Sequence, residues 1–456
     1  MHRSQSHIVA LAALLALSAT PLARAASLVD VYEAARNHDP VVAGARAGLD
    51  VNRQTVPQAR AAFLPSINAS TSTGRSDFKS GGADTVESNT DSWNVGLQQS
   101  IVNVESWFNY RSAQTSVRGA EFQFGATEQQ LISRTIQAYL NVLRADALLE
   151  SARAQEAAVK RQLEQVQQRF DVGLVAITDV LEAQAVFDDA VVQRIQAVGD
   201  HDIRFEDLRT LTGQPYVAID SLSEKLPIKN PEPNSAEEWV AIALETNLNI
   251  KIAESNLQAA EQSYRARRSA HLPTLSGSIS TGHSETDRPN IRDVGVSESD
   301  TTNYALTLSV PIFQGGRTHS QAVQARAQAE QSRQQLLDQR QTISRDTRNL
   351  LRSVSTDVAR VNARLKAIQS AQSALDATKT GYEVGTRNIV DVLQAQNRLY
   401  SSQFDYADSR YNYIIDLMLL KQAAGSLADE DLGDLNGFVD PNDPVTRLNS
   451  LRARGG

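Results

Sequence analysis

The sequence predicts a mainly α-helical chain that carries two short pairs of β-strands and an internal two-fold duplication. The duplication is the first observation: QRFDVGLVAITDVLEAQ (168–184) and TGYEVGTRNIVDVLQAQ (380–396) share eight of seventeen residues at an offset of 212. A second pair, AAFLPSINASTSTG (61–74) and SAHLPTLSGSISTG (269–282), matches at an offset of 208. Offsets this similar indicate one long duplication, since solenoid repeats have periods of about 20–50 residues. We therefore expect two structurally equivalent halves.

The spacing of apolar residues supplies the other two observations. Leu306, Leu308, Val310 and Ile312 alternate with Thr, Ser and Pro, which is the period of a β-strand. Long heptad seams follow each strand pair, with spacings that alternate between four and three residues. If it is helical from about Ser106, the first long element spans about 100 Å. The two seams contain Leu131, Thr135, Ala138, Val142, Ala145, Leu149, Ala152, Glu156, Val159, Leu163, Val166 and Phe170 in the first half, and Ile343, Leu350, Val354, Val361, Leu365, Ile368 and Leu375 in the second.

Each half has the same predicted order of a helical stretch, a strand pair and a long helical hairpin. Residues 213–238 form a Pro-rich linker that we expect beside the C-terminal segment, around the middle of the helices, and we expect the tail after Gly425 to be partly disordered. The predicted bounds are a first repeat over 26–212 (helix Val31–Arg60, strands about 64–102, hairpin about 106–212), a second repeat over 239–425 (helix Ala236–Arg268, strands about 272–313, hairpin about 316–425), and a C-terminal segment over 426–456.

The first 25 residues have the three parts of a secretory signal peptide. His2 and Arg3 precede an apolar stretch from Ile8 to Ala19, and Ala23-Arg24-Ala25 provides a small-x-small cleavage site. A buried N-terminal helix is the alternative. The signal predicts a mature protein that begins near Ala26, outside the cytoplasm.

Composition excludes several classes of protein. The chain of 456 residues has no Cys, which excludes a disulfide framework, a Cys-ligated zinc site and a thiol nucleophile. Its net charge of −8 argues against a nucleic-acid binder. The seven His are scattered without ligand spacing, and no P-loop, GxSxG or GxGxxG occurs, so we expect no enzyme, no metal and no cofactor.

If the predicted strands form a β-barrel in a membrane, one chain cannot close the barrel alone, because it supplies only four strands. Four strands with exposed edges would be unstable in lipid, whereas three subunits would supply twelve. The alternative is a small soluble β-sandwich inserted between the helices. We expect interface anchors at the aromatic residues near the strand ends, which are Phe63, Phe78, Trp93, Tyr304 and Phe313.

Several motifs resemble the TolC family of outer-membrane efflux ducts. They are GLVAITDV (173–180), VGTRNIVDVL (384–393), RYNYIIDLMLLKQAAGSL (410–427) and HLPTL (271–275), and the similarity covers essentially the whole mature chain. The resemblance implies a homotrimer, with a twelve-strand barrel through the outer membrane of a Gram-negative bacterium and a twelve-helix tunnel across the periplasm. It also implies a passive exit duct for efflux pumps and type I secretion. The expected partners are a periplasmic adaptor and an inner-membrane pump or ABC transporter. Docking of these partners is expected to open the duct by untwisting the inner hairpins.

The competing interpretation is a soluble periplasmic coiled-coil adaptor. Such a protein would need a soluble β-module between its helical halves. In this chain the predicted strands interrupt both halves in the same way, which favours the duct.

The repeated turns between the long helices are the candidate functional site. Gly173 and Gly385 stand where a left-handed helix C-cap is expected. Asn388 is a good N-cap, and Asp391 follows three residues later as in a capping box, with Asp179 at the same place in the first half. Helix capping alone would explain both aspartates.

The family resemblance implies a further role for these residues. Thr178 and Asp179 on one hairpin, with Tyr382 and Arg387 on the other, match the links that hold the tunnel entrance closed. Asp391 matches a position at the constriction, where three copies would form a carboxylate ring that selects cations. Gln394 replaces a second acidic residue there, so the ring is expected to be less acidic.

Overall fold

A computed structural model describes residues 25–79, 81, 85–223, 225–289 and 295–447. The predicted signal peptide, apart from Ala25, and the RARGG ending lie outside the described residues. The chain divides into two compact units, and each unit takes segments from both sequence halves. Unit 1 contains Met1–Ala43, Thr127–Asn247 and Ile343–Gly456, and unit 2 contains Gly44–Ala126 and Leu248–Thr342.

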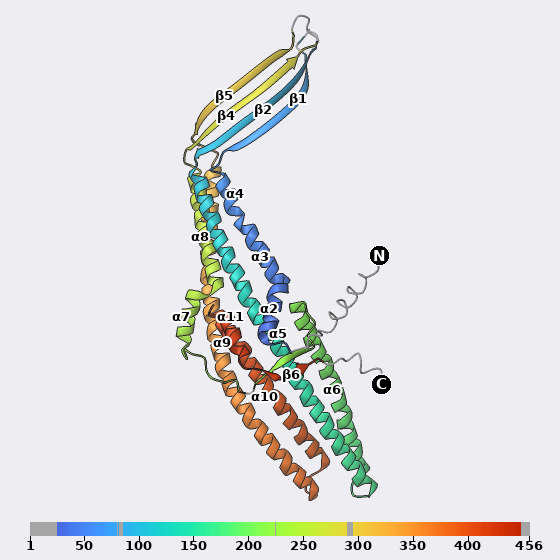
Figure 1. The fold of residues 1–456 in the computed structure, drawn as a ribbon. Helices are drawn as coiled ribbons and strands as arrows, with labels where there is room; N and C mark the ends of the chain where they lie inside the picture. Colours follow the sequence, from blue (N-terminus) through green and yellow to red (C-terminus); the bar gives the residue numbers. More distant parts are fainter. Residues whose placement is uncertain (1–24, 80, 82–84, 224, 290–294, 448–456) are drawn as a thin grey trace, which may run out of the picture. The chain divides into compact units, whose positions relative to one another are not determined.

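Unit 2 holds a four-stranded antiparallel sheet in the order β1-β2-β4-β5 (Figure 1). The central pair, β2 with β4, joins the two sequence halves, with Trp93 opposite His283. β5 ends at Ser309, short of the predicted Ile312, since Pro311 has no backbone N–H for a ladder. The two strand pairs expected from the sequence are confirmed. Their bounds are β1 (Ser66–Phe78), β2 (Val86–Val102), β4 (Thr274–Asp287) and β5 (Ser297–Ser309).

The predicted aromatic anchors occupy different positions on and beside this sheet. Phe78 and Phe313 are exposed near strand ends, whereas Trp93 and Tyr304 lie within their strands. Phe63 instead packs edge-on against two rings of the following helix, Trp107 and Tyr110, with centroid distances of 6.3 and 6.0 Å. The aromatic residues therefore do not form a single row at the strand ends.

Two long helical hairpins supply most of unit 1. The first consists of α5 (Val104–Asp171) and α6 (Ile177–Thr212), and the second of α9 (Arg317–Glu383) and α10 (Ile389–Ala423). α5 and α9 contribute residues to both units. The seam residues are largely buried as predicted, with Leu365, at 44% exposure, as an exception. Buried members of the seams include Leu131, Val142, Leu149, Val159, Val166, Val354, Val361 and Leu375.

The helical stretches that open each half are broken, unlike the single helices expected. The first comprises α2 (Leu28–His38), α3 (Pro40–Arg53) and α4 (Thr55–Ala61), and the second α7 (Ala236–Thr246) and α8 (Leu248–Ser269). Buried polar side chains stand at two of the breaks. Asp39 forms an ion pair of 2.7 Å with Arg134, and the Asn247 amide donates to the Ala423 carbonyl oxygen at 2.8 Å. These tertiary partners compensate for the interrupted helix hydrogen bonds.

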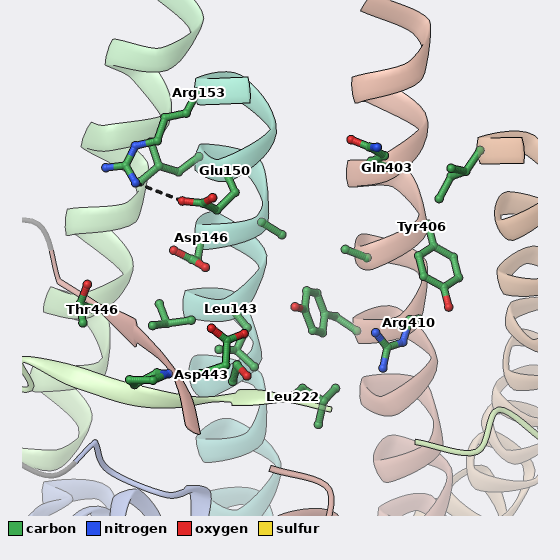
Figure 2. Close-up of a pocket in the computed structure, with 18 of the residues that line it drawn as sticks. Leu143, Asp146, Glu150, Arg153, Leu222, Gln403, Tyr406, Arg410, Asp443 and Thr446 are labelled. Carbon is green, nitrogen blue, oxygen red and sulfur yellow. Dashed lines mark hydrogen bonds and ion pairs between the residues drawn. The ribbon is translucent and has the colours of Figure 1, made fainter. Parts of the chain in front are cut away.

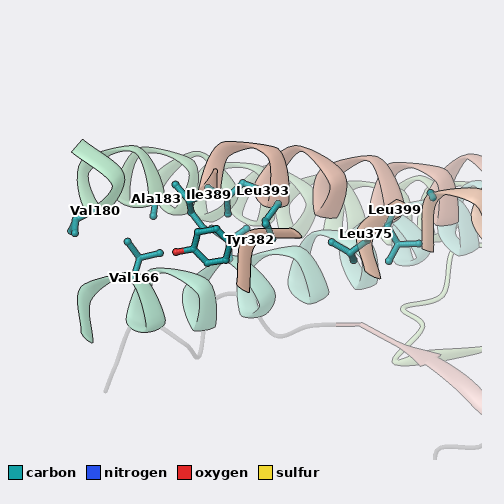
Figure 3. Close-up of a cluster of buried hydrophobic side chains, with 11 residues drawn as sticks. Val166, Val180, Ala183, Leu375, Tyr382, Ile389, Leu393 and Leu399 are labelled. Carbon is teal, nitrogen blue, oxygen red and sulfur yellow. The ribbon is translucent and has the colours of Figure 1, made fainter. Parts of the chain in front are cut away.

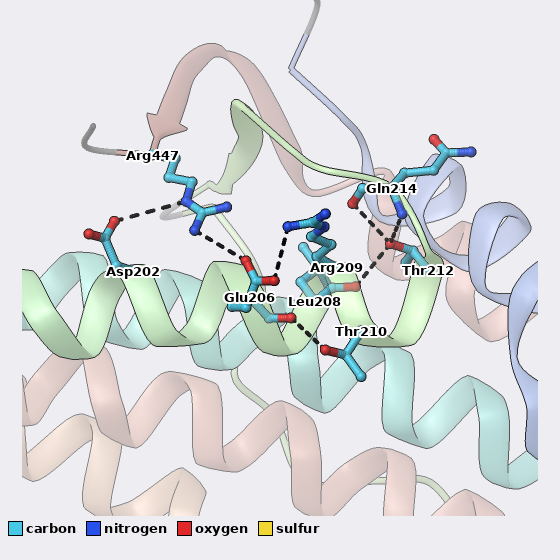
Figure 4. A network of polar contacts seen from close by, with 8 residues as sticks. All are labelled: Asp202, Glu206, Leu208, Arg209, Thr210, Thr212, Gln214 and Arg447. Carbon is cyan, nitrogen blue, oxygen red and sulfur yellow. Dashed lines mark hydrogen bonds and ion pairs between the residues drawn. The ribbon is translucent and has the colours of Figure 1, made fainter. Parts of the chain in front are cut away.

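The linker and the C-terminal segment come together as a two-stranded antiparallel sheet in unit 1. β3 (Ala218–Leu222) pairs with β6 (Val439–Thr446), and α11 (Asp429–Asn436) precedes β6. The expectation of disorder after Gly425 is thus wrong for residues 426–447. Next to β6, the Arg447 guanidinium lies 3.3 Å from a Glu206 carboxylate oxygen and 4.0 Å from one of Asp202, so it ties the strand to α6 (Figure 4).

Among the helices of residues 25–447 that the structure describes, none combines the length and the apolar character that a membrane-spanning helix requires.

Tyr139 fastens this small sheet to α5, and its removal tests the attachment. The Tyr139 hydroxyl donates to the Asp220 carbonyl oxygen at 2.6 Å, and the side chain is 1% exposed. We expect Tyr139→Phe to lower the free energy of unfolding by about 1–2 kcal/mol, because a buried acceptor loses its donor. Guanidinium unfolding of the purified protein in detergent measures this loss. The matched variant Tyr304→Phe, on an exposed side chain, should change stability little, and an equal loss in both would contradict the assignment.

Candidate functional site: the turns of the helical hairpins

The two hairpin turns share one backbone design. Gly173 and Gly385 have φ of 77° and 79°, a left-handed conformation that favours glycine. The residues around each glycine make the paired backbone hydrogen bonds of a Schellman motif, such as Leu174 N–H to the Arg169 carbonyl oxygen at 2.8 Å. The motif satisfies the last carbonyl groups of α5 and α9 and turns the chain back toward the return helix.

The first turns of the return helices differ between the halves. Asn388 and Asp391 form a complete capping box at the start of α10, as predicted. At the start of α6 the N-cap residue is Ala176, which has no side chain able to accept from the backbone. Among the described residues of one chain, the Asp179 carboxylate has neither a side-chain hydrogen bond nor an ion pair. The duplicated aspartate is therefore a helix cap in one half only.

Within one chain the predicted clamp residues are only partly brought together. The Arg387 guanidinium lies 3.8 Å from a carboxylate oxygen of Asp391, on its own hairpin. Thr178 is exposed, and Asp179 is half-buried. Among the described side chains, neither Thr178 nor Asp179 forms a hydrogen bond or an ion pair with Tyr382 or Arg387.

Tyr382 links the two hairpins through a contact that the sequence did not indicate. Its side chain is 9% exposed, and the Arg169 guanidinium carbon of α5 lies 4.8 Å from the centroid of its ring. Such a cation–π contact contributes about 0.5–2 kcal/mol. No pattern in the sequence signalled it, because the Arg169 position corresponds to Gly381 in the other half and shares no motif with it.

An apolar cluster surrounds Tyr382 and takes members from all four helices of the two hairpins (Figure 3). Val166 comes from α5, Val180 from α6, Leu375 from α9 and Ile389 from α10. Burying each such side chain contributes about 1.5–3 kcal/mol. The hairpins are therefore held together near their turns by apolar packing, and separating them would expose that surface to water.

Farther from the turns, polar contacts and a cavity lie between the hairpins. Arg144 on α5 pairs with Asp408 on α10 at 2.7 Å and donates to the Asn412 amide oxygen at 2.6 Å. A cavity of about 760 Å³ lies among α5, α10, β3 and β6. Figure 2 shows Glu150 and Arg153 of α5 on one side and Arg410 of α10 on the other. Polar contacts of this kind can be exchanged for water at smaller cost than an apolar seam.

A carboxyl pair lies between the two helices of the second hairpin. Asp357 on α9 is 2% exposed and accepts a hydrogen bond of 2.8 Å from Arg360. Burial, together with the charge of Asp416 on α10, raises the pKa of Asp357 to about 6, although Arg360 lowers it. Protonated Asp357 can donate to Asp416, so a proton at this position joins α9 to α10.

The described residues contain no group of three or more His, Asp or Glu placed to hold a metal ion. The arrangement at the turns instead has what a mechanical element needs, namely rigid helices, tight turns and a limited set of contacts between hairpins.

The sequence matches a known family in both halves. The profile of the family described as "Outer membrane efflux protein" matches residues 31–214 and 239–426. The chain is similar to Outer membrane protein TolC of Vibrio cholerae, with 34% identity over 416 residues that cover 90% of this chain and 93% of that protein. It is also similar to the alkaline protease secretion protein AprF of Pseudomonas aeruginosa, with 29% identity over 423 residues that cover 90% and 86% of the two chains.

Solved structures share the fold at lower sequence identity. The Campylobacter jejuni CmeC outer membrane channel superimposes with a TM-score of 0.76 and 17% identity, covering 91% of this chain and 90% of that one. The outer membrane protein VceC of Vibrio cholerae superimposes with a TM-score of 0.74 and 20% identity, covering 87% and 96%. At these identities the likeness concerns the fold alone.

The carboxyl pair predicts a pH dependence of stability. The pKa of Asp357 is higher in the folded chain than its ordinary value of 3.8, so the folded state binds this proton more tightly. The stabilisation of the folded chain by the proton on Asp357 is complete below about pH 4 and is lost as the pH rises through 6. We expect Asp357→Asn to remove this part of the pH dependence in unfolding measurements between pH 4 and 7. Asp338→Asn, at an exposed position on α9, is the control, and equal slopes for Asp357→Asn and the wild type would contradict the assignment.

Proposed function

The chain belongs to the outer membrane efflux protein family, and on that basis we propose that it is the outer-membrane exit duct of tripartite efflux and type I secretion systems. The proposal rests mainly on the family similarity, which spans both halves and includes both hairpins and the strands β1, β2, β4 and β5. Transport is passive in this proposal: the chain catalyses no reaction, and its partners supply the energy. The same similarity favours the duct over a soluble periplasmic adaptor.

The open edges of the sheet support a homotrimer. β1 and β5 are the outer strands of the four, and each pairs on one side only within the described chain. Unpaired backbone groups are not tolerated in a bilayer, so the edges need partners. Three copies joined β1 to β5 would close twelve strands. Apolar side chains exposed on β5, such as Tyr304, Leu306 and Leu308, fit contact with lipid.

The hairpin turns are the proposed gate. The apolar cluster around Tyr382 and the contact with Arg169 favour a closed arrangement in which the hairpins pack together. The clamp formed by Thr178, Asp179, Tyr382 and Arg387 completes this closure in the trimer. The Asp179 carboxylate, which caps no helix and has no side-chain partner among the residues that the structure describes, is suited to accept from Arg387 of a neighbouring subunit.

The exposed turns are also the proposed docking point for a periplasmic adaptor and its inner-membrane pump. Val172, Leu174 and Val384 are 70%, 72% and 69% exposed. Apolar side chains at such a tip are typical of a contact surface. Docking that favours separated hairpins would shift the population toward the open state.

The proposed cation ring consists of three copies of Asp391. Its carboxylate accepts from the Asn388 backbone N–H at 3.3 Å and lies beside Arg387, so each copy is partly compensated within its own chain. The neutral Gln394 one turn away adds no further charge. The proposed ring therefore attracts cations, but less strongly than a ring of uncompensated carboxylates would.

Conductance in a planar bilayer tests the clamp. Tyr382→Phe combined with Arg387→Ser should raise the single-channel conductance severalfold, because fewer contacts oppose separation of the hairpins. Arg398→Ser, at an exposed position of α10, should leave conductance unchanged. If the double variant conducts like the wild type, the clamp is refuted, while the assignment as a duct stands on the conductance of the wild type itself.

Cation block tests the ring. Asp391→Asn should weaken block by a trivalent metal cation by about tenfold or more, since three like charges at one level are removed together. Asp376→Asn, at an exposed position of α9, serves as the charge-matched control. Undiminished block in Asp391→Asn would leave the aspartate with a capping role alone.

A further inference from the structure

The two faces of the four-stranded sheet in unit 2 differ in charge. Alternate side chains of a strand point to opposite faces, and the register of the three strand pairs fixes which residues share a face. All Asp, Glu and Arg side chains of the four strands, from Arg75 on β1 to Asp300 on β5, lie on the same face. We call this face, which also bears Ile67, the charged face, and the opposite face, which bears Ser66, the neutral face.

The neutral face carries only small or uncharged polar side chains over five successive rows of the sheet. These rows contain alternate residues of Ser66–Gly74 on β1, Thr90–Gln98 on β2, Ser278–Thr286 on β4 and Ser297–Ala305 on β5. Each position in the rows is Ser, Thr, Asn, Gln, Gly or Ala. The five rows therefore form a surface with hydroxyl and amide groups, without a charge and without an aromatic ring.

The charged face has an apolar zone and an acidic zone. Ile67 and Tyr304 belong to one row of the apolar zone and are 69% and 76% exposed. Asp91, Glu285 and Glu298 share a row of the acidic zone, which lies toward the β1–β2 and β4–β5 connections. In a membrane barrel the face with the apolar zone meets the hydrocarbon of the bilayer, and the polar face lines the lumen. The neutral face is thus the one suited to the lumen.

We propose that the neutral face is the wall of the barrel lumen and that it passes hydrated cargo of either charge without discrimination. This inference rests on the proposed duct, in which three copies repeat the same wall. Hydroxyl and amide groups both donate and accept hydrogen bonds, so they suit cationic and anionic groups alike. The Ser72 and Ser92 hydroxyls lie 2.9 Å apart and pair with each other, which leaves fewer groups to retain a cargo. Charge selection is then left to the proposed Asp391 ring.

Single thiols test which face lines the lumen and whether its wall is neutral. The wild type has no Cys, so a charged methanethiosulfonate reagent that does not cross lipid finds only the introduced thiol. Ser280→Cys lies on the neutral face, and its neighbour Ile279→Cys lies on the charged face. In a planar bilayer at 1 M KCl, where screening limits charge effects to about 3 Å, conductance records the reaction. We expect an anionic and a cationic reagent to modify Ser280→Cys at rates within about threefold, and neither to modify Ile279→Cys.

Three outcomes of the thiol experiment would overturn the proposal. They are a tenfold difference between the reagents at Ser280→Cys, no reaction there, and reaction of Ile279→Cys. The conductance of the unmodified wild type reports on the duct itself, so failure of the wall assignment is distinguishable from failure of the proposed function.

An added charge tests the wall from the opposite direction. Ser72→Asp places three negative charges on the proposed lumen wall and should raise the permeability ratio of K⁺ to Cl⁻ at least twofold, as measured from the reversal potential in a KCl gradient. Thr73→Asp, on the charged face, is the matched control and should leave the ratio unchanged. Both substitutions are made in Asp391→Asn protein, so that the ring does not mask the wall. An equal effect of the two substitutions, or no effect of Ser72→Asp, would contradict the assignment.

Discussion

The rest of the molecule depends on the apolar seams of the long helices, which pack Leu149 and Ala152 of α5 with Ala197 of α6 and, near the turns, bring all four hairpin helices into one cluster. Val159 and Val354, both fully buried, belong to seams that run along helices of 68 and 67 residues. Isolated helices are marginally stable in water, and their persistence comes from packing of an apolar stripe. The seam makes each hairpin a stiff element, so that contacts between hairpins can change while each hairpin stays intact.

The contacts between hairpins differ in kind along their length. Near the turns an apolar cluster surrounds Tyr382. Farther away, the ion pair between Arg144 and Asp408 joins the hairpins, and a polar cavity lies between them. Apolar packing stabilises the packed arrangement of the hairpins without requiring specific partners. The stabilisation that ion pairs add depends on their geometry and on screening by salt. For the proposed gate, such a balance would keep the hairpins together without partners and let them separate when partners dock.

Duplication has left the two halves alike in backbone and different in chemistry. Both turns keep a glycine with positive φ, because few other residues adopt that conformation at low cost. The residue at the N-cap has diverged to Ala176 in one half and Asn388 in the other, so Asp391 is engaged in its own helix and Asp179 is not. The divergence frees one carboxylate for interactions outside its own helix.

By itself, the sequence determined the mainly helical fold, the strand pairs and the turn glycines, because heptads, alternation and positive-φ positions are local signals that each half repeats. The capping box at Asn388 and Asp391 was equally local. Only the tertiary structure decided that α3 and α8 are separate helices, that residues 426–447 fold against the linker, and that Arg169 covers Tyr382. These features join residues far apart in the chain, such as Asp39 with Arg134 and Asn247 with Ala423. No local pattern encodes such pairs, because they exist only once the helices have packed.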